Sequence, residues 1–504
     1  MTGGRIRRNL IANFGGQGAR AVMALLFVPF YVRILGVEAY GLIGLYTSLL
    51  LALGLLDAGL RPTLAREMAR FTGGAMDADA IRTLLRSIEW LLLGTALVIA
   101  MTMTAAAPWL AEHWVQPDAL PPEAIARAFT VMGLVAAAQV AESAYDSCLS
   151  GLQRQVLQNV IVTAVAALRG FGALAVLWIW PTVSAFFVWQ GAVALLSLTL
   201  LGMAVYRSLP PASAPVRFSL PALQAVRRYA LGIFAITLVA VLLMQSDRFL
   251  LSRFVPLGEL GRYTIAASLA SAIAFLSGPV GNASYPRMTE LIARGETAGL
   301  AAVFHQTTKL MALLTGTAAA LSVLFGERLL GLWLHDPALA ASAAPLLALL
   351  ATGSMFASLA AVTYLLQLAH GVTGLTLRLN LALLVVYLPV LFAAVWAHGA
   401  IGAALCLMAM NLAMMIAGAV LTFRRFLKAE ALRWWLGDVV PMLATVFGVA
   451  AILQLLLPHP KNPLVEAAVL LAAGGATLAC GLLADGQLRG IVFRTLRMAR
   501  ADAG

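Results

Sequence analysis

Four polar residues recur at helical spacing inside an otherwise apolar stretch of the chain. They are Gln139, Glu142, Ser143 and Asp146, at positions i, i+3, i+4 and i+7. A helix places residues so spaced on one face. Two carboxylates one turn apart repel each other, which favours a retained proton on one of them, as a proton-coupled step requires. The alternative is that Asp146 lies at the membrane edge and is merely hydrated.

Arg169 lies near the middle of the next apolar stretch and is the expected partner of Glu142. A charged group inside a membrane span costs about 2.5 to 3.5 kcal/mol on insertion scales, so such groups are rare and usually face a cavity. Two interpretations stay open with equal weight. One is a functional pair in a cavity, and the other is a neutralised structural ion pair.

A second polar stripe lies in the first apolar stretch, where Asn13, Gln17 and Arg20 stand at i, i+4 and i+7. The three side chains share one helix face, and Arg20 falls about mid-span. Neighbouring glycines indicate close approach or bending at this point. We expect the stripe to face a cavity; the alternative is a hydrogen bond that joins two helices.

Adjacent charges at Asp247 and Arg248 interrupt a later apolar stretch. Neighbours on a helix point about 100° apart, and a charged side chain that faces lipid is costly. At least one of the two should therefore face the protein interior. Asp57 with Arg61, and Arg86 with Glu89, are instead expected to form salt bridges at the membrane edge. The candidate coupling or gating carboxylates are Glu142, Asp146, Asp247 and Asp57.

The composition places these residues in a membrane protein. Of 504 residues, 62% are hydrophobic and 11% are charged, with a mean hydropathy of +0.91, whereas soluble domains carry about 25% charged residues. The net charge of +12 would suggest nucleic acid in a soluble protein, but basic residues confined to membrane loops report topology. We therefore expect no nucleic-acid partner.

The three cysteines are isolated within apolar stretches, and no Cys or His spacing suits zinc or a redox pair. We expect no metal, no cofactor and no catalytic residues. A membrane glycosyltransferase or polymerase is the alternative from the enzyme class, but such enzymes place catalytic residues in a large outer loop. Every outer loop here is short, so we expect a protein that is not an enzyme.

Apolar stretches of about 20 residues, long enough to cross a bilayer, recur along the whole chain. They predict an all-α polytopic protein of about fourteen transmembrane helices, with twelve as the alternative because the stretches at 307–325 and 379–396 are short. Lys and Arg concentrate in alternate loops, which predicts that both termini are cytoplasmic. The arginine-rich start is expected to precede a retained first helix rather than a cleaved signal.

A weak internal repeat divides the chain. The segment that begins GVEAYGLIGLY at Gly36 is echoed 221 residues later by PLGELGRYTIA, so Glu38 falls on Glu259. Six spans separate the copies, which predicts two parallel six-helix lobes around a central cavity. The expected divisions are an N-terminal lobe, a cytoplasmic linker, a C-terminal lobe, and a helix pair with a basic tail: 1–206, 207–228, 229–428 and 429–504.

Three strings carry a family resemblance: PFYVRILGVEAYGLIGLYTSL, LLDAGLRPTLAREMAR and SDRFLLSRFVPLGELGRYTIAASLA. They resemble the signatures of bacterial polysaccharide exporters, the O-antigen and exopolysaccharide flippases of the multidrug, oligosaccharidyl-lipid and polysaccharide exporter superfamily. The resemblance implies a V-shaped, two-lobed bundle in the inner membrane. It also implies transport of a sugar carried on undecaprenyl pyrophosphate, and a recurring Asp-Arg pair at Asp247 and Arg248.

Arginine suits an anionic headgroup because it is always charged and can bind phosphate through two donors. The candidate headgroup-binding residues are Arg20, Arg248, Arg169, Asn13 and Gln17. We expect a monomer among membrane lipids, with a lipid-linked oligosaccharide as substrate and other polysaccharide assembly proteins as potential partners. The alternatives are a flippase for the peptidoglycan precursor lipid II and a cation-coupled multidrug exporter. The last two helices either pack on the second lobe or form a groove for the lipid tail.

Overall fold

The structure, a computed structural model, describes residues 18, 22–54, 59–213, 215–372, 374–428 and 430–490. Among these residues the secondary structure is helical, apart from one isolated β-bridge between Gln116 and Pro256. The chain divides into two compact units, Met1–Gly261 and Arg262–Gly504, here called unit 1 and unit 2. The lobe boundaries expected at residues 206 and 428 stay predictions.

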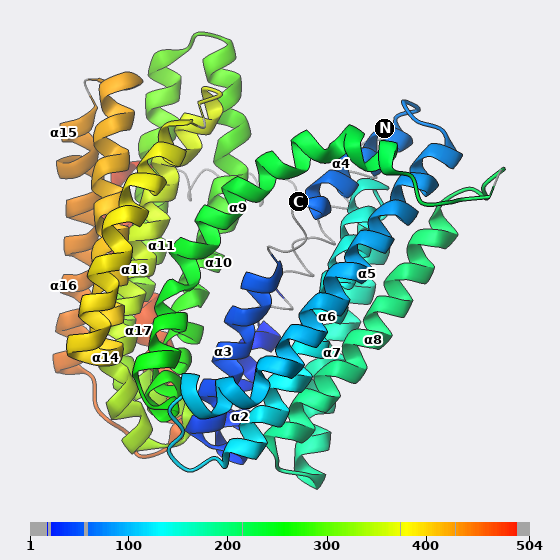
Figure 1. Cartoon of the computed structure of the whole chain (residues 1–504). Helices are drawn as coiled ribbons and strands as arrows, with labels where there is room; N and C mark the ends of the chain where they lie inside the picture. Colours follow the sequence, from blue (N-terminus) through cyan, green and yellow to red (C-terminus); the bar gives the residue numbers. More distant parts are fainter. Residues whose placement is uncertain are drawn as a thin grey trace, which may run out of the picture. The chain divides into compact units, whose positions relative to one another are not determined.

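Unit 1 contains a run of long helices (Figure 1). They are α2 Val28–Leu35, α3 Val37–Leu53, α4 Leu60–Thr72, α5 Ala78–Trp109 with the π-helical turn η2 Leu110–Trp114, α6 Pro122–Gly151, α7 Gln155–Ile179, α8 Val183–Ser208, α9 Leu220–Phe254 and the first residues of α10 Leu257–Ala293.

Unit 2 holds the rest of α10 and the remaining helices. They are α11 Thr297–Leu324, α12 Gly326–Leu334, α13 Pro337–Ala369, α14 Gly374–Arg425, α15 Ala431–Arg433, the π-helical turn η3 Trp434–Val439, α16 Val440–Leu456 and α17 Pro463–Ala484. Gly399 interrupts α14 with φ 54° and ψ −134°, a conformation that is open to glycine but strained for other residues. It therefore divides α14 into two arms.

Polar side chains fix where several helices begin. Asp77, Thr182, Ser219 and Asp336 each stand just before a helix and accept a hydrogen bond from the backbone N–H three residues on. Such caps satisfy donors that have no partner within the helix, at a gain of about 1 kcal/mol each. Short capped turns therefore separate long apolar helices, as the sequence pattern predicts.

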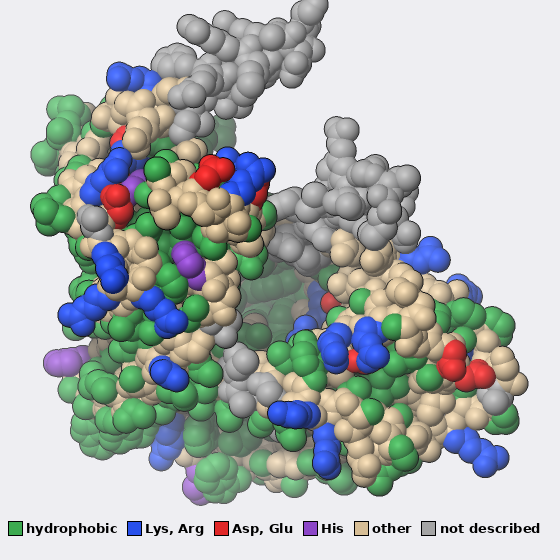
Figure 2. Space-filling model, turned by 90° about the horizontal axis from the view of Figure 1, so that it is seen from above, with side chains coloured by type: hydrophobic (Ala, Val, Ile, Leu, Met, Phe, Trp, Pro, Cys, Tyr) green, Lys and Arg blue, Asp and Glu red, His purple; other side chains and the backbone are tan. Residues whose placement is uncertain are grey.

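Ten helices among the described residues are long and apolar enough to cross a membrane. Large hydrophobic side chains are exposed along them, including Leu97, Val385 and Leu471, whereas soluble proteins rarely expose broad apolar patches. Figure 2 looks onto one end of the helices, where Lys and Arg side chains gather above hydrophobic flanks. The all-α membrane fold is confirmed, and the count of fourteen helices stays a prediction.

The helix α6 is central to unit 1 and packs against α4, α5 and α8 (Figure 1). Close packing depends on small residues: a Cβ at Gly133 would lie 2.3 Å from the Cβ of Met103 on α5, and one at Gly151 would lie 2.3 Å from the carbonyl oxygen of Ala65 on α4. Small residues let helix backbones approach closely inside a membrane. The faces of α6 that remain between these contacts are available to line cavities.

The repeated glutamate at Glu38 has a structural role in unit 1. Its carboxylate accepts hydrogen bonds from the backbone N–H groups of Asp118, Ala119 and Leu120, at 2.8, 3.0 and 3.2 Å. Asp118 in turn accepts one from the N–H of Gly258 at 3.0 Å. The start of α3, the loop before α6 and the start of α10 are thereby joined at one end of the unit.

The helices α16 and α17 pack on α11 within unit 2. Ala320 of α11 and Phe325 form an apolar cluster with Ala450, Leu470 and Ala473 of the pair. A bidentate ion pair joins Arg328 of α12 to Glu466 of α17, at 2.6 and 2.9 Å. The interpretation that the last two helices pack on the neighbouring helices therefore agrees with the structure.

Candidate functional site

The polar face of α6 lines a cavity of about 490 Å³ in unit 1. The wall also includes residues of α3, α4 and α7 and one residue of α8. The structure thus places the four-residue stripe of the sequence on a single hollow. The charged and polar lining residues include Arg61, Gln139, Glu142, Ser143, Asp146 and Arg169.

A three-helix contact organises the cavity wall. The guanidinium of Arg169 on α7 lies 2.9 Å from the Glu142 carboxylate of α6, with side-chain exposures of 23% and 17%. Ser197 of α8 donates its hydroxyl hydrogen to the other Glu142 oxygen at 2.7 Å. An ionised pair with this extra hydrogen bond is neutral as a whole, so it can persist in an apolar bundle.

Asp146 lies one turn along α6 and accepts a hydrogen bond from Gln158 of α7 at 2.9 Å. It also lines a second hollow of about 410 Å³, which extends to Thr237 and Val241 of α9. The two hollows adjoin and are together called the polar interior of unit 1. Five residues line both of them: Leu50, Leu51, Gly54, Arg61 and Asp146.

Two buried donors on this wall are not satisfied by the part of the chain that the structure describes. They are Nε of Arg169 and Nε2 of Gln139, both of which belong to residues that line the 490 Å³ cavity. A buried donor without a partner costs about 1 to 3 kcal/mol. Their position on a cavity wall fits groups that bind an oxygen-rich ligand.

Asp247 and Arg248 do not belong to this interior. Asp247 is 4% exposed and Arg248 is half-buried, but the α9 lining residues reach only as far as Val241. Six further residues correspond to about 9 Å along a helix. The remaining candidates, Asn13, Gln17, Arg20 and Asp57, lie outside the described residues.

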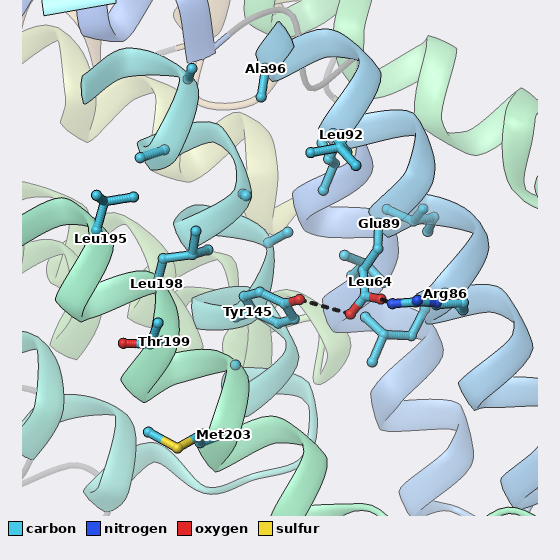
Figure 3. Close-up of a pocket in the computed structure, with 18 of the residues that line it drawn as sticks. Leu64, Arg86, Glu89, Leu92, Ala96, Tyr145, Leu195, Leu198, Thr199 and Met203 are labelled. Carbon is cyan, nitrogen blue, oxygen red and sulfur yellow. Dashed lines mark hydrogen bonds and ion pairs between the residues drawn. The ribbon is translucent and has the colours of Figure 1, made fainter. Parts of the chain in front are cut away.

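The opposite side of α6 lines a larger, mainly apolar pocket of about 730 Å³, bounded by α5 and α8. Figure 3 shows Leu92, Leu195 and Leu198 around it and Glu89 close to Tyr145. A hollow of this size lies in the range of small-molecule sites. The helix α6 therefore separates a polar cavity from an apolar one.

Glu89 closes the polar end of this pocket. It accepts hydrogen bonds from the hydroxyls of Tyr145 and Tyr206, at 2.8 and 2.7 Å, and pairs with Arg86 at 3.1 Å. The salt bridge to Arg86 follows from the i, i+3 spacing in the sequence. The tyrosines stand 56 and 117 residues away along the chain, so no local pattern could identify them.

A family model described as "Polysaccharide biosynthesis protein" matches residues 6–292, more than half of the chain. This chain belongs to that family. The resemblance drawn from the three sequence strings is thereby confirmed. A search of curated protein sequences gives no match.

Solved structures of transporters share the fold of this family member. One is described as a multidrug resistance MATE family transporter of the MOP superfamily in an inward-facing conformation (TM-score 0.65, 15% identity, 81% of this chain and 95% of that one). Another is the lipid II flippase MurJ in an inward closed conformation (TM-score 0.65, 12% identity, 97% and 99%).

A third is a MOP superfamily transporter from Pyrococcus furiosus (TM-score 0.52, 14% identity, 85% of this chain and 96% of that one). Identities this low show the fold alone. With the ten apolar helices and the family, they establish a multi-pass membrane protein with the fold of these solved structures.

The Glu142–Arg169 pair predicts non-additive stability losses. Arg169→Leu leaves Glu142 buried without its cation, so we expect a loss near the low end of about 3 to 5 kcal/mol. The double variant with Glu142→Leu should recover much of that loss. Unfolding of the purified protein in detergent, compared across the double-mutant cycle, measures both effects.

The matched control is Arg287→Leu, which breaks an exposed ion pair with Glu290 in unit 2. It should change stability by less than about 1 kcal/mol. Equal losses at Arg169 and Arg287, or strictly additive losses within the cycle, would contradict the assignment of a buried pair.

The tyrosines at Glu89 give a second stability test. Tyr145→Phe and Tyr206→Phe each remove a hydrogen bond to a carboxylate and should each cost about 1.5 kcal/mol. Tyr229→Phe is the control, because it keeps the ring that lies under Arg66, 4.8 Å from the guanidinium. Unfolding of the purified protein in detergent measures these changes. A loss of stability in Tyr229→Phe as large as in the other two variants would argue against a special role for Glu89.

Proposed function

We propose that this protein is a flippase in the bacterial inner membrane, with both termini cytoplasmic. It moves an oligosaccharide linked to undecaprenyl pyrophosphate from the cytoplasmic to the outer leaflet, for the synthesis of O-antigen, capsule or exopolysaccharide. The observation that carries the proposal is the polar interior of unit 1, which lies among apolar helices and contains two buried donors that the described residues leave unsatisfied. Membership of the polysaccharide biosynthesis protein family supports it.

The chemistry of the interior suits a sugar. Sugar hydroxyls need both donors and acceptors, and the wall offers amide, hydroxyl, carboxylate and guanidinium groups side by side. The charges on the described part of the wall balance, because it carries two arginines, Arg61 and Arg169, and two carboxylates, Glu142 and Asp146. A balanced wall can replace the hydration of a neutral, oxygen-rich headgroup without holding a fixed ion.

The pyrophosphate requires cations of its own. Arg20 and Arg248 remain our candidates, with Asn13 and Gln17 beside Arg20, because an arginine stays charged and can bind phosphate through two donors. Arg169 is the third candidate; it is paired with Glu142 through Nη2, and its buried Nε has no hydrogen-bond partner among the described residues. The prenyl tail would stay in the bilayer.

Alternating access is the proposed mechanism. The two six-helix lobes, 1–206 and 229–428, would rock about the central site and expose it first to the cytoplasm and then outward. The linker at 207–228 would join them, and the helix pair within 429–504 would follow the second lobe.

A lipid II flippase is the second candidate. One structure of the same fold is described as the lipid II flippase MurJ and matches 97% of this chain, and another is described as a multidrug resistance transporter and matches 81%. The fold alone admits both substrates. A multidrug exporter for cations would favour a cavity dominated by carboxylates. The balanced wall around Glu142 and Arg169 does not have that character.

Transport in proteoliposomes separates these functions. The purified protein should translocate a fluorescent undecaprenyl-pyrophosphate oligosaccharide, and Arg248→Ala should reduce the rate at least tenfold. Arg253→Ala is the control on the same helix, since the Arg253 guanidinium lies 5.8 Å from the centre of the Phe254 ring and is given no role. Preference for lipid II, or for a cationic dye, would replace the proposal, and full activity of Arg248→Ala would remove Arg248 from the site.

Gln139 distinguishes a functional group from a structural one. Gln139→Leu removes a buried donor that the described residues leave unsatisfied, so stability should hold or rise, while translocation of the oligosaccharide should fall severalfold. Thr130→Ala is the matched control on α6, because the Thr130 hydroxyl bonds to its own helix, to the carbonyl of Ala126 at 3.1 Å, and Thr130 is not among the residues that line the cavity. Undiminished transport by Gln139→Leu would show that the donor does not contact the substrate.

Proton coupling through Glu142 is a further part of the proposal. Glu142→Gln cannot exchange a proton, so transport by this variant should no longer respond to an imposed proton gradient, while the wild-type rate should follow the gradient. Wild-type transport that ignores a collapsed gradient would eliminate this coupling.

A further inference from the structure

A buried histidine in unit 2 lies between two carboxylates from another segment. His305 of α11 is 1% exposed; its Nδ1 is hydrogen-bonded to Asp438 of η3, and its Nε2 lies 2.9 Å from the Glu430 carboxylate just before α15. Asp438 is 2% exposed and Glu430 is 26% exposed. The two carboxylates stand 133 and 125 residues from the histidine in the sequence.

The contacts fix the number of protons in the group. A neutral imidazole has one N–H and one nitrogen that only accepts, and an ionised carboxylate only accepts. With a carboxylate oxygen at each ring nitrogen, a neutral ring and two ionised carboxylates would leave one contact between two lone pairs. One additional proton, on the ring or on a carboxyl, is needed for both contacts to be hydrogen bonds.

The surrounding charges favour the same proton. Lys309, one turn along α11, lies 3.8 Å from Asp438 and 2.6 Å from Asp485, and Arg433 lies 3.6 Å from Glu430. Burial alone would raise the pKa of Asp485, but hydrogen bonds from Lys309 and from backbone N–H groups outweigh it and hold that pKa below its usual value. Two cations therefore face three carboxylates, and one proton on the cluster makes it neutral.

Aromatic rings enclose the site on its other sides. Trp434, which is fully buried, donates its indole N–H to Thr308 of α11 at 3.0 Å. The ring of Phe423, at the end of α14, lies 5.8 Å from Phe304 and 5.6 Å from Trp434. Water therefore has little access from these sides, and the partly exposed Glu430 is the carboxylate best able to turn to solvent.

We propose that His305, Glu430 and Asp438 form a proton-binding site, and that its single bound proton fastens the 430–439 segment to α11. When the proton leaves, the Glu430 contact opens, because that carboxylate can be hydrated and can stay near Arg433. The segment leads directly into α16, so the site controls how firmly the last two helices are attached at this end. The inference does not depend on the transported substrate.

Hydrogen exchange of the purified full chain tests the site. Exchange of the backbone amides of 430–439, corrected for the intrinsic effect of pH, should accelerate about tenfold or more when the pH is raised from about 5 to 8 and the bound proton leaves. Glu430→Gln should abolish this acceleration, because an amide N–H can donate to the unprotonated ring nitrogen and satisfy both contacts without the extra proton.

Two comparisons keep the test decisive. Asp438→Asn should also abolish the acceleration, because the Asn amide N–H can donate to Nδ1 of His305 without the extra proton. This variant replaces Glu430→Gln if Glu430→Gln fails to fold. Glu290→Gln, at an exposed carboxylate in the same unit, should leave the wild-type response intact. A wild-type segment with equal corrected exchange across the window, or a folded Glu430→Gln variant that keeps the full acceleration, would overturn the proposal.

Discussion

Burial of charge in an apolar bundle is the constraint on which the arrangement of unit 1 depends. No charged group inside a membrane helix is tolerated unless the protein supplies its partner or its water. Glu142 has both a cation and a hydroxyl, from α7 and α8, so these two helices must stay in register with α6. This contact lies within the polar wall, and α6 presents an apolar face to the pocket on its other side.

A wall of cancelling charges also suits transport better than a wall of one sign. A substrate must bind well enough to enter and weakly enough to leave. A row of unpaired arginines would hold a pyrophosphate tightly, whereas Arg169, already paired with Glu142, offers only a fraction of its donors. In the proposed flippase, donors such as Gln139 would add weak, directional contacts to a headgroup made mostly of hydroxyls.

The sequence predicts what is local and misses what is distant. Helical spacing identified the stripe on α6, and opposite charges at mid-span identified Arg169 as the partner of Glu142. Neither signal could identify Ser197, because a single serine in an apolar helix has no distinctive pattern in the sequence. The tyrosines at Glu89 and the Gln158 contact to Asp146 were missed for the same reason. Asp438 and His305 stand 133 residues apart, so no local pattern indicates that they meet.

Two carboxylates attach the last helix pair to its neighbours at opposite ends: Glu466 in α17, and Asp438 directly before α16. Glu466 is held by Arg328 through two short hydrogen bonds, and arginine keeps its charge at any physiological pH, so this attachment is permanent. At the other end, Asp438 is hydrogen-bonded to His305, within the proposed proton-binding site. At that same end Lys309 of α11 also pairs with Asp485, directly after α17, at 2.6 Å. Loss of the proton would therefore loosen the 430–439 segment and the start of α16, while α17 stays attached at both of its ends.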